Sequence, residues 1–216
     1  MGAHHLTKNT YEYDELGQLK RENNKQTNKT VLYEYDLYGN ILKQAEYPYT
    51  TGTPAGTGAV KTYTYGNTNW KDQMTAFNGK AITYDEIGNP LTYDGYGITW
   101  TQSRTLSNLS GNGKNIEYKY DLNGLRYEKT VNGTQTEYTY LGSQLRSMKT
   151  GGEEYLFFYS GGGARLGMRY NGAEYYYLSN GLGDVIAMMD CRGQKVVEYT
   201  YDSWGDILSV TGSMAG

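Results

Sequence analysis

The sequence has few of the side chains that enzymes use for chemistry. Its 216 residues include one cysteine, Cys191, and two histidines, His4 and His5. A single cysteine cannot form an intrachain disulfide, and we interpret Cys191 as a small apolar residue on a strand rather than a reactive thiol. With its only histidines at the N-terminus, the chain has no Ser-His-Asp set, no Cys-His pair and no His-rich zinc site. We therefore expect a protein that is not an enzyme and that carries no cofactor and no metal.

Long apolar runs and an excess of positive charge are also missing. No stretch approaches the roughly 18 apolar residues of a membrane span, so we expect no membrane insertion by this segment. The 20 basic and 23 acidic residues are mixed along the chain and leave a net charge of −3, which argues against a nucleic-acid partner. No signal peptide is visible, and residues 1–5 resemble a leader or an affinity-tag remnant.

Tyrosine and glycine are the residues that stand out. The chain has 25 Tyr against 3 Phe and 3 Trp, and 29 Gly against only 3 Pro. This mixture is typical of many short strands joined by turns. Burying a large side chain contributes roughly 1.5–3 kcal/mol, so tyrosine rings can replace a leucine core. Their hydroxyls need partners or water, which predicts a sheet with one wet face.

One motif, Tyr-x-Tyr-Asp-x-x-Gly-x-Leu/Ile, recurs along the chain. Residues two apart on a strand share a face, so the two tyrosines lie on one side of a strand. Asp then opens a tight turn and Gly closes it with positive φ, so each copy predicts a β-hairpin. The structural residues of the copies are Tyr11, Tyr13, Asp14, Gly17, Tyr33, Tyr35, Asp36, Gly39, Tyr84, Asp85, Gly88, Tyr118, Tyr120, Asp121, Gly124, Tyr199, Tyr201, Asp202 and Gly205.

The spacing of the copies predicts a repeat array. Asp14 and Asp36 are 22 residues apart (36 − 14), and Asp184 and Asp202 are 18 apart (202 − 184). We predict one all-β array over residues 6–216, with loop insertions at about 45–60 and 105–115 and no long helix. The consecutive antiparallel hairpins would form one long, twisted, spiral-type sheet that is open at both ends. Its unpaired edges predict self-association.

The motif resembles the YD repeat, also called the RHS repeat, over nearly the whole chain. The segments Tyr175–Ile186 and Val197–Gly205 are similar to the region just before the RHS-associated core of Gram-positive wall-associated or secreted toxins. The resemblance implies a spiral sheet that closes as a shell around a C-terminal toxin. The chain contains no Asp-Pro pair, so the self-cleaving aspartates of the family's core are carried over to no residue here.

The resemblance implies a structural function. The chain would be a shell segment of a large secreted or cell-surface bacterial toxin, and the toxin domain itself is absent from the sequence. Its partners would be the rest of the parent shell and the C-terminal toxin cargo. The repeated aspartates could in principle bind a metal, but one carboxylate per repeat favours turn capping.

The alternative is a binding module for a carbohydrate or a cell-surface receptor. Exposed Tyr and Trp rings match the apolar faces of sugars, and the candidate stacking residues are Trp70, Trp100 and Trp204. A binding module predicts that these rings gather at one loop-lined patch near residues 47–58 or 100–113. Packing of the rings against neighbouring hairpins is the simpler interpretation.

Overall fold

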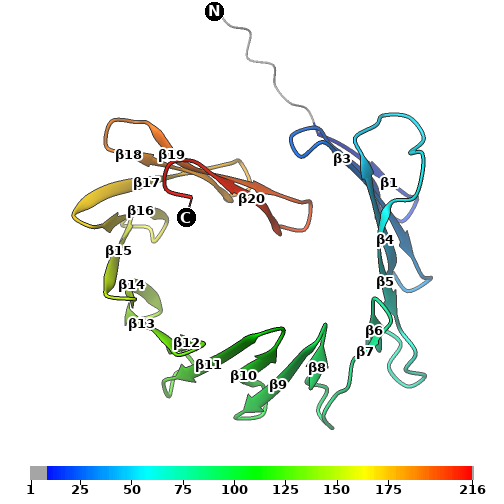
Figure 1. The fold of residues 1–216 in the computed structure, drawn as a ribbon, viewed down its shortest axis with the longest axis horizontal. Coiled ribbons are helices and arrows are strands. Elements are labelled where there is room, and N and C mark those ends of the chain that lie inside the picture. The colour runs from blue at the N-terminus through cyan, green and yellow to red at the C-terminus, as the bar shows by residue number, and fades with distance from the viewer. Residues whose placement is uncertain (1–8, 216) are drawn as a thin grey trace, which may run out of the picture. The chain divides into compact units, whose positions relative to one another are not determined.

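The structure, a computed structural model, describes residues 9–215, and these residues form only strands, turns and loops (Figure 1). Within each of its two sheets the strands lie in sequence order, each beside its neighbour in sequence, which confirms the predicted fold class of consecutive antiparallel hairpins. Residues 1–5, interpreted above as a leader, lie outside the described part of the chain.

The strands form two sheets, each a simple meander. The seven-stranded sheet contains β1 (Thr10–Tyr13), β2 (Leu19–Asn24), β3 (Lys29–Tyr35), β4 (Ile41–Pro48), β5 (Ala59–Thr64), β6 (Ala76–Phe77) and β7 (Lys80–Ala81). The 13-stranded sheet contains β8 (Thr92–Tyr93), β9 (Tyr96–Thr101), β10 (Thr105–Gly111), β11 (Lys114–Tyr120), β12 (Arg126–Val131), β13 (Thr134–Leu141), β14 (Gln144–Thr150), β15 (Glu153–Tyr159), β16 (Arg165–Tyr170), β17 (Ala173–Ser179), β18 (Val185–Asp190), β19 (Lys195–Tyr201) and β20 (Ile207–Thr211).

The chain divides into two compact units between Gly95 and Tyr96. We call them the N-terminal unit and the C-terminal unit. The single sheet predicted over residues 6–216 is therefore two sheets in the structure. The strands β6, β7 and β8 have two residues each, and the motif copy at residues 82–91 forms only an isolated bridge between Tyr84 and Pro90. Proline has no N–H for a ladder, which limits pairing at this point.

Two kinds of turn alternate along both units. Asp-x-x-Gly turns join β1 to β2, β3 to β4, β11 to β12 and β19 to β20. Short turns with left-handed asparagines join β6 to β7, β10 to β11, β12 to β13 and β16 to β17 (Asn78, Asn112, Asn132 and Asn171). Since consecutive turns of a meander lie at opposite ends of the strands, these four Asp turns and the tight Asn-Gly turns lie along opposite rims of their sheets. The Asp190–Gly193 turn between β18 and β19 is an exception, because it lies on the same rim as the Asn-Gly turns.

Two local predictions were wrong. The loop expected at 105–115 is instead occupied by β10 and β11. Asn112 and Gly113 have φ of 47° and 74°, which makes a two-residue hairpin turn, and a bulge between Leu106 and Asn108 hides the strand periodicity. Cys191, expected on a strand, is exposed in the turn between β18 and β19. The other insertion is a loop, between Pro48 at the end of β4 and Ala59 at the start of β5.

The core is thin, as expected for single-layered sheets. In the N-terminal unit, Leu19, Val31 and Tyr33 are buried together, with Tyr35 and Ile41 packed against them. In the C-terminal unit the buried hydrophobic residues are Ala187, Met188 and Val197. Most tyrosines are therefore only partly covered by their neighbours on the same face.

Candidate functional site

The repeated aspartates cap the turns in which they lie. The Oδ1 atom of Asp121 accepts hydrogen bonds from the backbone N–H groups of Asn123 and Leu125, at 2.9 and 2.8 Å. Equivalent pairs of bonds end on Asp14, Asp36, Asp85 and Asp202. The glycine that closes each of these turns has φ between 77° and 89° (Gly17, Gly39, Gly88, Gly124 and Gly205). The carboxylates thus bind the backbone of their own hairpins.

Three further turns have the same geometry with less obvious sequences. Asn180 accepts from the N–H groups of Leu182 and Asp184 at 2.9 and 3.0 Å. Asp190 and Ser160 occupy the same position in their turns. At the strand end where Asp202 lies, the preceding cap is Asn180 rather than Asp184, and its spacing of 22 residues (202 − 180) equals that of Asp14 and Asp36. Allowing Asp, Asn or Ser three residues before Gly would have found these turns in the sequence.

The second tyrosine of the motif connects successive hairpins. The hydroxyl of Tyr140 on β13 donates a hydrogen bond to the carbonyl of Arg126 on β12, at 2.9 Å. The ladder between these strands has already ended at Glu128 and Glu137, so this carbonyl lies beyond the last paired residues. The same bond joins Tyr35 to Leu19, Tyr159 to Leu145 and Tyr201 to Val185, at 2.8, 2.8 and 2.6 Å. Phenylalanine could not make this bond, which gives a reason for the excess of tyrosine.

The C-terminal unit has one aromatic face, which we call the tyrosine face. Cross-strand partners share a face, and the register aligns Tyr138 with Met148, Met148 with Tyr155, and Tyr155 with Tyr170. The rings of Tyr155 and Tyr170 are stacked with centroids 4.7 Å apart. Both hydroxyls donate to the carboxylate of Glu153, and this hydrogen bond raises the pKa of Tyr170 to about 12.

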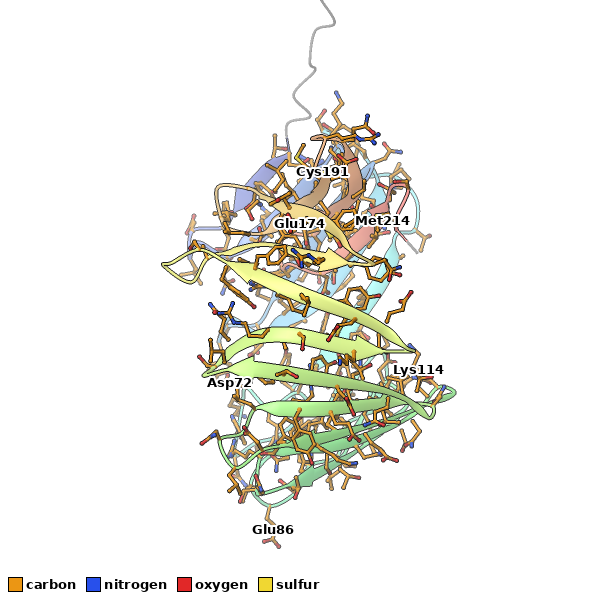
Figure 2. All side chains as sticks on the ribbon, turned by 90° about the vertical axis from the view of Figure 1, so that its left-hand side faces the viewer. Asp72, Glu86, Lys114, Glu174, Cys191 and Met214 are labelled. Carbon is orange, nitrogen blue, oxygen red and sulfur yellow. The ribbon has the colours of Figure 1, made fainter. Side chains whose placement is uncertain are left out.

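The opposite face, which we call the charged face, carries ion pairs. Lys119 pairs with Glu128 at 2.7 Å, and Lys149 pairs with Glu154 at 3.2 Å. Arg169 pairs with Glu174 at 2.7 Å. Figure 2 shows the strands of this unit one beside the next. Lys114, the first residue of β11, lies at the strand end beside the Asn112-Gly113 turn. These three ion pairs therefore lie on the face opposite the aligned tyrosines.

An open groove of about 600 Å³ lies on the tyrosine face. Leu145, Phe157, Tyr159, Arg165 and Tyr177 are among the residues that line it, and they come from β14, β15, β16 and β17. Burial raises the pKa of Tyr177, so its hydroxyl stays protonated at neutral pH. Among residues 9–215, no cluster of three or more His, Cys, Asp or Glu could hold a metal.

Comparison of the chain with known protein families agrees with this repeated hairpin geometry. The sequence matches the family described as Teneurin YD-shell over residues 3–213. The chain belongs to the YD-shell family. This confirms the resemblance found from the Tyr-x-Tyr-Asp motif, and the chain is a segment of a YD-repeat shell.

The curated relatives of this YD-shell segment are much longer proteins. The chain is 33% identical over 201 residues to the tRNA3(Ser)-specific nuclease WapA of Bacillus spizizenii, and 33% identical over 201 residues to the tRNA nuclease WapA of Bacillus subtilis strain 168. It is 34% identical over 145 residues to the tRNA(Glu)-specific nuclease WapA of Bacillus subtilis subsp. natto. The first two alignments cover 90% of this chain but only 8% of each relative.

Solved structures show the same fold as the YD-shell segment. The chain superposes on the structure of TcdB2-TccC3-TEV with a TM-score of 0.69 and 18% identity, covering 94% of this chain and 12% of that chain. It superposes on TcdB2-TccC3-Cdc42 with a TM-score of 0.66 and 17% identity, over 94% and 12% of the two chains. The likeness extends over nearly all of the two sheets described above.

Two of the candidate tryptophans of the YD-shell segment, Trp100 and Trp204, lie in the C-terminal unit, and the third, Trp70, lies in the N-terminal unit. Trp204 is 56% exposed in the turn between β19 and β20, and Trp100 is partly buried on β9 opposite Leu106. The sheet order separates these two positions by nearly the whole C-terminal unit. Trp70 is 50% exposed in the N-terminal unit, between β5 and β6 and against Gly88. The structure therefore does not bring Trp100 and Trp204 together.

The described part of the chain contains no helix that is long and apolar enough to cross a membrane.

Proposed function

We propose that this YD-shell segment is part of the wall that encloses a toxin domain of a larger bacterial protein. The observation that carries the proposal is the match to the YD-shell family over residues 3–213, together with the nuclease names of its relatives. The segment corresponds to 8% of the relatives' length. The remaining length provides room for further wall and for a separate toxin domain.

The relatives themselves support a division between wall and toxin. Proteins named for different tRNA targets, tRNA3(Ser) and tRNA(Glu), match this chain with nearly equal identity, 33% and 34%. A segment that is shared to this degree does not determine which tRNA is cut. We propose that the wall contributes no catalytic step, and that any nuclease or other toxic activity resides in a different domain of the full-length protein.

The two-faced sheet suits an enclosing wall. The hydrogen-bonded ladder and the tyrosine bonds between hairpins hold a single layer together without a second layer to cover it. A single layer leaves both faces available, one to solvent and one to an enclosed polypeptide. We further propose that the full-length protein is secreted or displayed at the bacterial surface, because a nuclease enclosed in a wall would meet its target after release into another cell.

Protease protection tests the wall function. The full-length protein is compared with a variant that carries Leu156→Pro, because Leu156 on β15 pairs with Ser147 and Arg169 on both sides. Proline at this central strand removes a ladder bond and opens the wall. The enclosed domain should then be cleaved at least about tenfold faster by a small amount of protease, corresponding to about 1.4 kcal/mol in the opening equilibrium.

The control is a proline at an exposed loop position, Thr53→Pro, between β4 and β5. It should leave the protection unchanged. Equal protection of the C-terminal domain in wild type and Leu156→Pro would contradict the wall function, and so would a full-length protein whose C-terminal domain is cut as fast as the same domain expressed alone.

Glycan or receptor binding is a second candidate because Trp70 and Trp204 are each at least half exposed. In that case Trp204→Ala should abolish retention on a glycan array while the unfolding midpoint stays the same. Trp70→Ala supplies the same test for the N-terminal unit.

Self-association through the end strands is a separate proposal. The outer edges of β1 and β20 are the ends of the two sheets, and unpaired backbone groups favour pairing with another chain. Light scattering at rising concentration should show dimers or larger assemblies of the isolated segment, and a monomer at all concentrations would overturn this proposal.

A further inference from the structure

Three arginines of the C-terminal unit differ from the cations of this unit that form ion pairs. Arg126, Arg146 and Arg165 lie at or near the first residue of β12, β14 and β16. Within residues 9–215, none of the three has a carboxylate at ion-pair distance, whereas Lys119, Lys149 and Arg169 do. The guanidinium groups of the three arginines are therefore available to bind an anion.

These arginines lie against the tyrosine face. The guanidinium of Arg126 lies between the rings of Tyr118 and Tyr138, at 5.3 and 5.2 Å from their centroids. The guanidinium of Arg146 lies 5.8 Å from the centroid of Tyr159. Rings hold a guanidinium by cation–π attraction but do not offer oxygen acceptors for its N–H hydrogen bonds, as a carboxylate does. The packing thus orients each cation without neutralising it.

The burial of Arg126 makes this contrast stronger. Its Nε atom is buried and has no hydrogen-bond partner in the described structure. Burial raises the pKa of the neighbouring Tyr120 and Tyr140, and the Arg126 charge acts in the opposite direction on both. A partly buried cation without an anion is unfavourable, so an incoming carboxylate gains more here than at a solvated lysine.

Arg165 is placed at the open groove of about 600 Å³ on the same face. Tyr159, which carries Arg146 on its ring, lines this groove together with Phe157 and Tyr177. The groove therefore combines a guanidinium with apolar ring surface. When a carboxylate of a bound polypeptide contacts the guanidinium, an apolar side chain beside it in that polypeptide would contact these rings.

The positions of the arginines select an extended partner. They occur on every second strand, which separates neighbours by roughly 9.6 Å across the sheet. The register also shifts them along the strands: Arg126 lies near the level of Tyr155, whereas Arg165 is opposite Tyr159, four residues further along β15 (159 − 155). We propose that Arg126, Arg146 and Arg165 form a diagonal row that binds an acidic polypeptide segment in an extended conformation.

A single-stranded nucleic acid fits this row less well. Bases bind such surfaces by stacking on free aromatic faces. Here Tyr118, Tyr138 and Tyr159 have guanidinium groups over their rings, and Tyr155 and Tyr170 stack on each other. Carboxylates need only the outward N–H groups of the arginines.

The proposal does not depend on the wall function. The row would bind an acidic segment whether that segment belongs to an enclosed toxin, to another part of the same protein or to a separate protein. A failure of peptide binding would leave the protease-protection test unaffected, and unprotected cargo would leave peptide binding unaffected.

The test uses this chain and a fluorescein-labelled peptide of repeated Asp-Pro-Pro triplets, followed by anisotropy at low salt. The triple variant Arg126→Gln, Arg146→Gln and Arg165→Gln should bind about tenfold more weakly, because three partly exposed ion pairs are lost. The matched control is Lys119→Gln, Lys149→Gln and Arg169→Gln, which removes the same charge from the charged face. It should keep its affinity within about twofold.

Two further measurements keep the outcome clear. Arg165→Gln alone, at an exposed position, should weaken binding by about threefold without changing the unfolding midpoint. A peptide of the same length with asparagine in place of every aspartate, Asn-Pro-Pro, should lose most of the binding, because it offers no carboxylate. The proposal is overturned if both triple variants lose affinity equally, if the Asp-Pro-Pro peptide does not bind, or if an oligothymidine binds more tightly than the peptide through the same arginines.

Discussion

The two units are built from the same motif but are held together differently. The C-terminal unit is regular: from β9 to β20 its strands have five to eight residues and are joined mostly by short turns. The N-terminal unit contains β1 to β5, which have four to eight residues, and the two-residue strands β6 and β7. It also contains a loop of residues 49–58 between β4 and β5. Comparing the two units separates the stability that comes from the repeated motif from the stability that comes from side-chain contacts outside the motif.

In the N-terminal unit a buried polar network fixes the loop. The Nη2 atom of Arg21 donates hydrogen bonds to the carbonyls of Thr50 and Gly52, at 2.7 and 2.6 Å. Thr30, which is completely buried, accepts from the N–H of Thr50 at 2.9 Å, and its hydroxyl lies 3.0 Å from Asn23 Oδ1. Stability in this unit is therefore concentrated in a few residues, whereas in the C-terminal unit it is spread over the repeats.

The largest effect is expected at the buried network. Thr30→Val keeps the shape of the side chain but leaves the N–H of Thr50 without its acceptor and removes the hydrogen bond that Thr30 donates to Asn23 Oδ1, which should cost about 2–4 kcal/mol. Thr136→Val on β13 is the control, because Thr136 donates only to the Thr150 hydroxyl at 2.9 Å. It should cost less than about 1 kcal/mol. Urea unfolding measures both, and equal losses would show that the two units do not differ in this way.

A smaller effect is expected at a turn cap of the C-terminal unit. Asp121→Ala removes the acceptor of two backbone N–H groups, and we expect a loss of about 1–2 kcal/mol in the free energy of unfolding. Leu122→Ala changes the next residue of the same turn, whose side chain is fully exposed, and should have almost no effect. A loss at Leu122 as large as the loss at Asp121 would mean that the turn is stabilised by packing instead.

A still smaller loss of stability is expected when one tyrosine hydrogen bond between hairpins is removed. Tyr140→Phe removes only the hydroxyl that donates to the Arg126 carbonyl, so about 1 kcal/mol should be lost. Tyr138→Phe, two residues earlier on the same strand and face, removes a hydroxyl without a protein partner in the described structure and should be nearly neutral. A thermal or urea midpoint that falls equally in both variants would remove the proposed role of the second tyrosine.

The sequence predicted the repeated features because they are local. An Asp-x-x-Gly turn needs one acceptor and one residue with positive φ, and both are visible in four consecutive letters. The tyrosine period of two predicted a common face in the same way. The turn at Asn180 was overlooked because a different side chain makes the same two bonds.

The remaining features depend on contacts between distant residues. Arg21 meets Thr50 across 29 positions of the chain, and no repeat pattern announces such a pair. The strand at residues 105–111 was predicted as a loop because its serines and asparagines are typical of turns, while cross-strand pairing with β9 and β11 decides the outcome. The row of Arg126, Arg146 and Arg165 likewise follows from strand order, since the three residues share no motif.

The smallest expected effect is a pH dependence at the Asp36 turn. The side-chain amide of Asn40 donates to Asp36 Oδ2 at 2.9 Å, and with the neighbouring N–H groups it lowers the pKa of Asp36 below its ordinary value of 3.8. A lowered folded pKa means that the stabilisation is present above the unfolded pKa and is lost as the pH falls through the folded pKa. Asp36→Asn should therefore reduce the drop in unfolding free energy between pH 5 and pH 2, by roughly the share of one carboxylate. Glu15→Gln, in the neighbouring exposed turn, accepts no hydrogen bond in the described structure and is the control. An unchanged acid limb in Asp36→Asn, measured by urea unfolding at each pH, would show that the unfolded chain holds this carboxylate as strongly as the folded turn.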